Sequence, residues 1–580
     1  MKRHIGRVLG GIVFFAAALA QAAPPPVPAE EAGAMVALLG RIGAISAADA
    51  KRLIRKYSLP DRTGREPGEL RTCGTSTLWR MREWLRAEGV RILREPPPSA
   101  GHVDSALFPV RAFYADESQR TQAQQAVAYA EQAWQRQIVE IGYRAPHTLG
   151  DGEPVSAGMD FYFAESDEWA GLTVPLADLP STSRCDCSSR IFLNSYLAGR
   201  HMAGTLEHEF NHSTQAAADC AENISAWEMF AEAAELIAFP NDWSSLSMIR
   251  EFQKWPQYPL DYYSMSESSG APSIAYIYGA SLFALFLKDR QGLGGAPFLP
   301  AAWEAFSQEG TMFEFNGGVA YCTAGNTPNW FDGLDALLAT KGSSLRAAFT
   351  EFSEWRAIVG WWDDEHHLTI ARSISEPSIG ASLSRFPVRN WLGVREYGTR
   401  YLEYLPSSDD EGPLTVTITG KVETTWSGSV LLWRVGQPVE SLPMTFDAQA
   451  VATVVTPPLA GITRVLIVVN QLQDATHLPD ERDYDNERFF EYRVAQAAGQ
   501  DAGPPPGPDA AAPGPDAELA SPDAQPAGPD AGPAIASDGG PAPESDEGCG
   551  CSSSGTGAGL SALMVVAGLV ALRRRQTLLS

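Results

Sequence analysis

The feature that most constrains this chain is the pentapeptide His208-Glu209-Phe210-Asn211-His212. Residues i and i+4 of an α-helix project from nearly the same face, so both imidazoles can reach one metal ion. His-Glu-x-x-His on a helix is typical of zinc hydrolases, in which the glutamate after the first histidine acts on a water as general base. The chain has only nine histidines, so two at this spacing are informative. The motif predicts His208 and His212 as ligands of Zn2+ and Glu209 as the catalytic base.

The segment Glu222–Glu235 lacks Gly and Pro and ends before Pro240, which predicts a second helix. We expect this helix to supply another metal ligand. Glu228, Glu232 and Glu235 fall at i, i+4 and i+7, which is one stripe of a helix. Such a stripe is usually the solvated edge of an amphipathic helix. Here it follows the histidine pair by sixteen to twenty-three residues, which lets a second helix fold back on the first. A glutamate of this stripe is therefore the expected third ligand.

Length and charge limit the classes of protein and of partner. A chain of 580 residues predicts three or four folding units, and an apolar content of 44% is ample for a large core. The formal net charge of −26 argues against nucleic acid and against an anionic membrane surface as partners.

The first residues predict export. Residues 1–23 combine a basic start with the apolar stretch Val8–Ala20 and end in the small-x-small cleavage pattern Ala20-Gln21-Ala22. The apolar stretch is short for a membrane anchor, which is the alternative interpretation. We therefore expect a signal peptide and an exported mature protein.

Residues 24–104 predict helical segments that form either a packing subdomain or a removable pro-segment. Within them, Arg71-Thr72-Cys73-Gly74 resembles the cysteine switch of some zinc-protease zymogens, in which a thiolate occupies the coordination site of the water. The alternatives for Cys73 are a disulfide partner and a buried thiol. Five cysteines precede the C-terminal tail, so at least one of them lacks an intramolecular partner. The exported context favours disulfides among the others.

Residues 105–368 predict a unit of strand, helix, strands and metal-binding helix. The expected elements are Leu107–Tyr114, Thr121–Ile141, Met159–Phe163, Arg190–Leu193 and His201–Ala217. This is the order of a zincin upper domain, whose edge strand holds an extended peptide through backbone hydrogen bonds. We expect Arg190–Asn194 to be that edge strand.

Tyr278 lies at the start of a predicted apolar helix, Ala280–Leu287. A buried tyrosine at such a position usually packs with its hydroxyl satisfied. Zincins also use a downstream tyrosine or histidine to stabilise the tetrahedral oxyanion, so Tyr278 is a candidate catalytic residue.

In their order along the chain, these motifs resemble a family of secreted zinc metalloproteases found in myxobacteria and relatives. The resemblance covers residues 105–365 and is carried by Gly142–Pro146, His208–His212 with Gln215, Trp227–Glu235, Tyr278-Gly279 and Leu334–Gly360. It implies a gluzincin-like fold, a polypeptide substrate and Glu228 as third zinc ligand, with Glu235 as a partner of a ligating histidine. Met229 and Phe230 depart from the small residues that are more frequent there, which keeps Glu232 as the alternative ligand.

The remaining chain predicts a β-domain and a spacer. Residues 369–497 contain strand-like segments such as Leu414–Thr419, which alternates with period two, and predict a β-sandwich. Residues 498–547 are rich in Pro, Ala, Gly and Asp, with ten acidic residues and no Lys or Arg, and predict a disordered linker.

Residues 548–580 resemble the myxobacterial C-terminal sorting signal. They contain Gly548-Cys549-Gly550-Cys551, the apolar stretch Ala558–Leu572 and Arg573-Arg574-Arg575. The resemblance implies processing near the cysteines by a sortase-like enzyme and delivery to the outer cell surface. Before processing, the apolar stretch would be a transmembrane helix with its arginines in the cytoplasm. A permanent membrane anchor is the alternative.

The expected fold class is therefore α+β: a zincin-like metalloprotease domain with a mainly helical lower half, then the β-sandwich, the linker and the transmembrane helix. The expected function is zinc-dependent hydrolysis of peptide bonds at the cell surface. Two alternatives stay open: an inactive zincin that binds peptide or glycan, and a non-peptide zinc hydrolase that acts on envelope material.

If residues 548–580 attach the protein to the cell, their deletion should release the protein into the medium, because the apolar stretch and the processing site are lost together. Immunoblots of medium and cell fractions measure this. A deletion of equal length in the linker, residues 503–535, is the matched control and should leave the protein cell-associated. Continued association of the 548–580 deletion would show that the tail is not the anchor.

Overall fold

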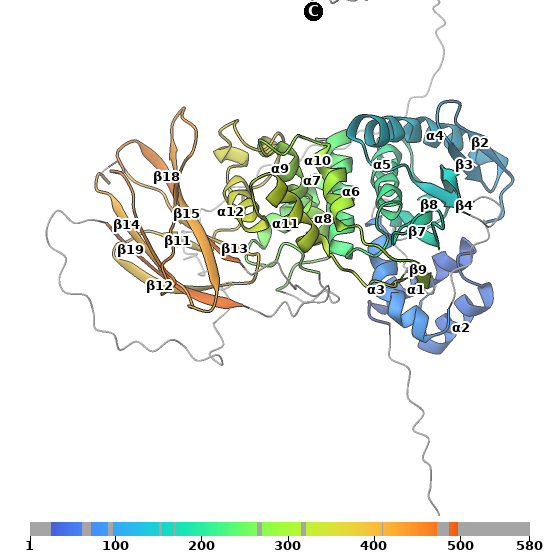
Figure 1. Cartoon of the computed structure of the whole chain (residues 1–580), viewed down its shortest axis with the longest axis horizontal. Coiled ribbons are helices and arrows are strands. Elements are labelled where there is room, and N and C mark those ends of the chain that lie inside the picture. The colour runs from blue at the N-terminus through green and yellow to red at the C-terminus, as the bar shows by residue number, and fades with distance from the viewer. Residues whose placement is uncertain are drawn as a thin grey trace, which may run out of the picture. The chain divides into compact units, whose positions relative to one another are not determined.

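The computed structural model describes residues 25–60, 71–90, 97–149, 154–166, 169–263, 270–314, 321–408, 410–472 and 487–496. They form a mixture of helices and several β-sheets, an α+β protein (Figure 1). The expected signal peptide (residues 1–23), linker (498–547) and C-terminal segment (548–580) lie outside the described residues. Among the helices that are described, none has the length and apolarity needed to cross a membrane.

A six-stranded sheet lies beside the predicted metal-binding helix. In spatial order its strands are β1 (Arg71–Cys73), β7 (Trp169–Asp178), β8 (Cys187–Asn194), β6 (Met159–Ala164), β3 (Val110–Tyr114) and β2 (Gly101–Asp104). β7 is antiparallel to β8, whereas β1 pairs in parallel with the outer side of β7.

The prediction that Arg190–Asn194 is the edge strand is wrong. These residues belong to β8, which is buried along its whole length between β6 and β7. β7 lies on the outer side of β8, and the sequence pattern did not predict it as a strand. Nine of its ten residues are buried, so it lacks the alternation of apolar and polar residues that marks a half-exposed strand.

Helices cover both faces of this sheet. On one face lie α4 (Arg120–Trp134), which continues as a π-helical turn to Ile141, and α5 (Gly199–Ala216). The helix predicted over 121–141 is confirmed, and it ends at Gly142, whose φ of 97° is a left-handed value that glycine adopts without strain. On the other face lie α1 (Ala29–Arg41), α2 (Ala47–Tyr57) and α3 (Thr75–Ala87), which share a hydrophobic cluster with Leu172, Val174 and Leu176 of β7.

A second group of helices packs beyond α5 around one large hydrophobic cluster. Its members are α6 (Ile224–Ala238), α7 (Trp243–Lys254), α8 (Ala275–Gly279), α9 (Ser281–Asp289), α10 (Phe298–Phe306), α11 (Trp330–Thr340) and α12 (Leu345–Trp355). Two short strands, β9 (Met312–Glu314) and β10 (Tyr321–Cys322), pair beside them, as do β4 (His147–Leu149) and β5 (Pro154–Ala157) near the larger sheet.

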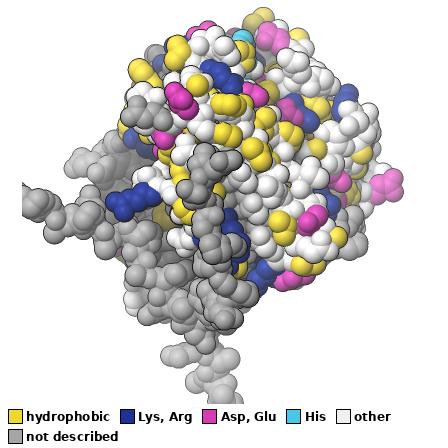
Figure 2. Space-filling model, turned by 90° about the vertical axis from the view of Figure 1, so that its left-hand side faces the viewer, with side chains coloured by type: hydrophobic (Ala, Val, Ile, Leu, Met, Phe, Trp, Pro, Cys, Tyr) yellow, Lys and Arg dark blue, Asp and Glu magenta, His cyan; other side chains and the backbone are white. Residues whose placement is uncertain are grey.

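The C-terminal described region consists of two antiparallel-rich sheets with a common hydrophobic cluster between them. One sheet contains β11 (Ala381–Leu383), β13 (Thr399–Tyr404), β18 (Ile462–Leu472), β15 (Thr425–Arg434) and β16 (Glu440–Pro443). The other contains β12 (Val388–Val394), β19 (Arg488–Gln496), β14 (Leu414–Thr419) and β17 (Val451–Val455). Buried and half-buried residues alternate along β14, as its sequence predicted. On the face shown in Figure 2, hydrophobic, acidic and basic side chains of the described residues are interspersed.

Two disulfides join the sheet to the helical region. Cys187, at the start of β8, pairs with Cys220, which follows α5, and Cys185 pairs with Cys322. The first bond therefore fixes the C-terminal end of the metal-binding helix to the strand beside it.

Replacing Cys187 and Cys220 together by serine should lower the free energy of unfolding by about 3–4 kcal/mol, since the bond closes a loop of 33 residues in the unfolded chain. Chemical denaturation followed by Trp fluorescence measures the change in midpoint. An unchanged midpoint in the double variant would show that this bond does not contribute to stability.

Candidate metal centre

Helix α5 brings the two motif histidines together inside the protein. His208 and His212 have 2% and 0% of their surfaces exposed, and their ring centroids lie 4.7 Å apart. His212 Nδ1 lies 2.8 Å from Gln215 Oε1, while Gln215 Nε2 donates to the Trp227 carbonyl. Because the amide oxygen accepts the Nδ1 proton of His212, the Nε2 atom of His212 is left with its lone pair for a metal.

Glu228 of α6 approaches the outer nitrogens of both histidines. Its Oε2 atom lies 3.2 Å from His208 Nε2 and 3.3 Å from His212 Nε2. Ligand atoms of these three residues and of Cys73 lie within 4.8 Å of one another, which makes the four a group that can hold one metal ion. Two imidazole nitrogens and one carboxylate oxygen are also the protein ligands of many catalytic zinc sites.

Glu232 and Glu235 contact the opposite nitrogen of His208. Their Oε2 atoms lie 3.3 Å and 3.7 Å from His208 Nδ1. These three residues form a second group with metal-ligand spacing, but it contains only one imidazole and shares His208 with the first. A ligating histidine usually donates its other ring N–H to a carboxylate, and Glu232 occupies that place.

Glu209 points from α5 toward β7. Thr173 Oγ1 lies 2.6 Å from Glu209 Oε2 and donates a hydrogen bond to it. Glu209 Oε1 has no hydrogen-bond partner among the described residues and is fully buried. One oxygen is thus held in place, and the other is free to accept a proton.

Two glycines allow these carboxylates to approach so closely. A Cβ atom on Gly171 of β7 would lie 2.5 Å from Glu209 Oε1, and one on Gly204 of α5 would lie 2.6 Å from Glu235 Oε1. Real Cβ atoms do not come that near, so an alanine at either position would displace the carboxylate. Neither glycine, nor Thr173, carries a motif that the sequence could have revealed.

Tyr278 of α8 reaches the same site. Its ring centroid lies 6.0 Å from that of His208, and its hydroxyl lies 2.9 Å from Ser76 Oγ. The tyrosine selected from the sequence is therefore a neighbour of the histidines, although its hydroxyl is engaged by another side chain.

Cys73 is the fourth member of the group. It is a buried free cysteine, and its Sγ atom lies 3.6 Å from His212 Nε2. The other four cysteines of the described residues form the two disulfides, so the structure does not support a disulfide partner for Cys73.

The buried carboxylates of this site outnumber its imidazoles, which favours the binding of a cation. Four carboxylates (Glu209, Glu228, Glu232 and Glu235) surround two imidazoles, and all six residues are at most 6% exposed. The ion pairs that Glu228, Glu232 and Glu235 make in the described chain are with the two histidines. Buried charges are stable only when they are paired or bind metal, and two imidazoles cannot neutralise four carboxylates. The residues therefore fit a divalent cation.

The surroundings of the site shift the pKa values of three of these carboxyl groups. Burial raises the pKa of Glu209, and burial together with the charge of Glu232 raises that of Glu235 well above its usual range. Burial also acts to raise the pKa of Glu228, but the charge of His212 and hydrogen bonds with both imidazoles lower it to about 2. The surroundings of Glu228, the carboxylate nearest the two Nε2 atoms, thus favour its ionised form.

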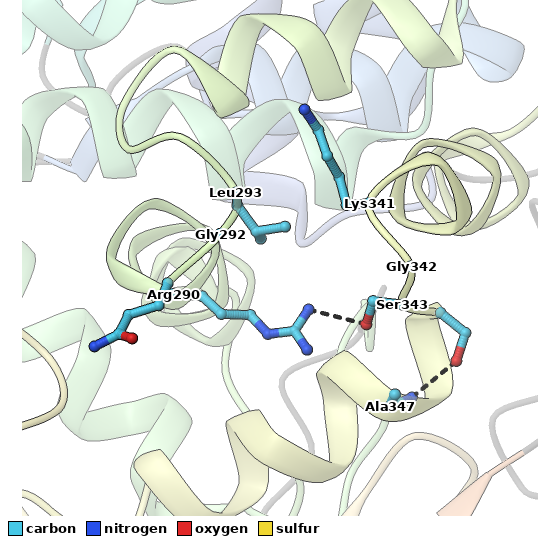
Figure 3. A pocket seen from close by; sticks show the side chains of 9 residues that line it. Arg290, Gly292, Leu293, Lys341, Gly342, Ser343 and Ala347 are labelled. Atoms are coloured by element: carbon cyan, nitrogen blue, oxygen red, sulfur yellow. Dashed lines mark hydrogen bonds between the residues drawn. The ribbon is translucent and has the colours of Figure 1, made fainter.

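A separate hollow lies in the helical region and shares none of these residues. It has a volume of about 440 Å³ and is lined by Arg290, Lys341, Ser343 and their neighbours (Figure 3). The guanidinium of Arg290 already pairs with Glu351 at 2.8 Å and donates to Ser343 Oγ. Its charge is thus largely satisfied within the protein.

No protein-family model matches the sequence, and no curated protein matches it. Among solved structures, one match is the pre-peptidase C-terminal domain of a collagenase from Bacillus anthracis, which covers 21% of this chain and 99% of that domain. The identity is 6% and the TM-score is 0.14, so this likeness carries no argument about fold or function.

Exchanging each candidate ligand for alanine should separate the roles of Glu228 and Glu232. Glu228→Ala should lose most bound zinc, because it removes the oxygen beside both Nε2 atoms. Glu232→Ala should retain zinc with an affinity about 10–100-fold lower, since it removes only a partner of His208 Nδ1. Metal analysis and chelator competition on both purified variants measure this, and the reverse pattern would assign the ligand role to Glu232.

Proposed function

We propose that this protein is an exported zinc metalloendopeptidase in which His208, His212 and Glu228 hold the metal and Glu209 is the general base. The single observation that carries the proposal is the convergence of two Nε2 atoms and one Glu228 oxygen in the buried interior of the protein. The motif glutamate lies on the same helix, with one oxygen anchored and the other free.

Zinc in such a site supplies Lewis-acid polarisation of a carbonyl and lowers the pKa of a bound water. The protein supplies the proton transfers. Glu209 accepts the proton of the attacking water at Oε1 and hands it to the leaving amine, while Thr173 fixes Oε2 and thereby the direction of the carboxylate. Glu232 and Glu235 orient His208 through Nδ1.

Tyr278 is our candidate for stabilising the developing oxyanion. Its ring packs beside His208, and a tyrosine hydroxyl next to a metal site can donate a hydrogen bond to an oxyanion. Ser76 holds that hydroxyl in the described conformation, so this role requires the hydroxyl to exchange partners.

The fold that we infer is zincin-like, with the six-stranded sheet and α5 above a mainly helical half that begins at α6. The strand that would bind an extended polypeptide is β7, because its side away from β8 pairs with only the three-residue β1. The resemblance to the secreted metalloproteases of myxobacteria supports the zincin-like fold and a polypeptide substrate.

For the location, we propose export followed by display on the outer cell surface. Two disulfides support an oxidising compartment. The signal peptide, the transmembrane stretch and processing by a sortase-like enzyme rest on residues 1–23 and 548–580 of the sequence.

A second candidate function follows from Cys73. Four protein ligands without an open position are typical of structural zinc sites, so a Cys-His-His-Glu site that never opens would be an inactive zincin that binds peptide or glycan. Hydrolysis of a peptide library by the purified ectodomain or by its Cys73→Ala variant, lost on chelation and restored by zinc, decides between the two. Cleavage of envelope glycans but not of peptides would favour the non-peptide hydrolase.

Glu209→Gln should reduce peptide hydrolysis by about 10²–10⁴-fold, the usual contribution of a general base, and leave the zinc content near one per chain. The amide keeps the size and the Thr173 contact but accepts no proton. Glu140→Gln, the same change at an exposed position, is the control and should alter neither quantity. Undiminished hydrolysis by Glu209→Gln would refute the role of Glu209.

A further inference from the structure

Cys73, the last residue of β1, and the three residues that follow it contact His212, strand β7 and Tyr278. We propose that Cys73 is a fourth protein ligand of the metal and that residues 71–76, here named the plug, keep the centre closed in the full chain. The expected consequence of this closure is a latent enzyme, and that part rests on the proposed peptidase function. The ligand role of Cys73 rests only on the contacts of its sulfur.

The sulfur of Cys73 lies among the donor atoms of the proposed metal site. It lies 3.6 Å from His212 Nε2 and belongs to the same group of donor atoms as His208 and Glu228. The backbone N–H of Thr75 donates to this sulfur at 3.3 Å, which fixes the position of the sulfur beside the histidines. Zinc with four protein ligands has no position for a water, whereas catalytic zinc keeps one.

The plug also occupies the strand edge where a substrate would pair. Gly74 N donates to the Gly171 carbonyl at 2.7 Å, and Thr173 N donates to Thr75 Oγ1 at 3.1 Å. Gly171 and Thr173 are the residues of β7 that lie against Glu209. An extended peptide that binds here must take over these backbone groups, so it competes directly with the plug.

The third contact engages the hydroxyl of Tyr278, the candidate hydrogen-bond donor to the oxyanion. Ser76 Oγ lies 2.9 Å from the Tyr278 hydroxyl, and that hydroxyl also lies 3.5 Å from the Cys73 carbonyl. One short segment thus engages a metal ligand position, the substrate edge and Tyr278 together.

The plug is held by the folded N-terminal helices. Leu78, Met81 and Leu85 of α3 belong to the hydrophobic cluster that α1 and α2 form with β7. Buried Glu31 of α1 accepts from Thr77 at 2.6 Å and pairs with Arg80. The closed position is therefore part of the packing of residues 25–60 and 71–90, and we expect a change at Cys73 alone to open the metal site while α3 stays packed.

Cobalt substitution of the full chain tests the ligand directly. Cobalt-loaded wild-type protein should show a thiolate-to-cobalt charge-transfer band in the near ultraviolet, and Cys73→Ala should lack it while binding one cobalt per chain. Cys73→Ser, which keeps the size but replaces the thiolate by a poor ligand, is the matched variant. In the zinc forms, peptide hydrolysis by both variants should exceed that of the wild type at least about tenfold, the factor expected when a bound inhibitor group costs 1.4 kcal/mol.

Absence of the band in cobalt-loaded wild type would overturn the proposal. So would equal hydrolysis by the wild type and the variants. If the band is present but neither wild type nor variants hydrolyse peptides or casein, Cys73 is a ligand and the proposed peptidase function fails instead. Should both variants misfold, alkylation of wild-type Cys73 followed by peptide mapping still decides: the metal must protect this thiol and a chelator must expose it.

Discussion

The structure around α5 depends on the neutralisation of carboxylates buried with two imidazoles. Glu228, Glu232 and Glu235 arrive from one helix stripe, and Glu209 arrives from the motif helix itself. Removing so many acids from water is costly, and burial raises the pKa of Glu209 and Glu235 accordingly. A divalent cation would remove this cost, which couples metal binding to the folding of both helices.

The two faces of β7 explain how a hydrophobic core and a reaction site share one strand. Leu172, Val174 and Leu176 point into the cluster of the N-terminal helices, whereas Gly171 and Thr173 face Glu209. A shift of register by one residue would exchange these faces and bury leucines against the proposed metal ligands. The packing of α1–α3 on the sheet therefore also sets the position of Glu209, the proposed general base.

The N-terminal helices thereby take part in the site rather than lying beside it. They carry the segment that joins Cys73 to the metal ligands and Ser76 to Tyr278. They also cover apolar residues of the sheet, so their loss would expose Leu172 and Val174 to water. This favours a packing subdomain over a segment that can be discarded without consequence for the sheet.

The sequence alone determined the elements whose signals are local. Spacing gave the His208–His212 helix, the Glu stripe of α6, the helix that ends at Gly142 and the alternation of β14, because each follows from the period of one element. Only the tertiary structure decided that β7 is the strand beside Glu209, that Glu228 and Glu232 face opposite nitrogens of His208, and that Cys73 reaches them. Cys73 is separated from His212 by 139 residues. Such contacts depend on how the sheet and helices pack, and no local pattern encodes them.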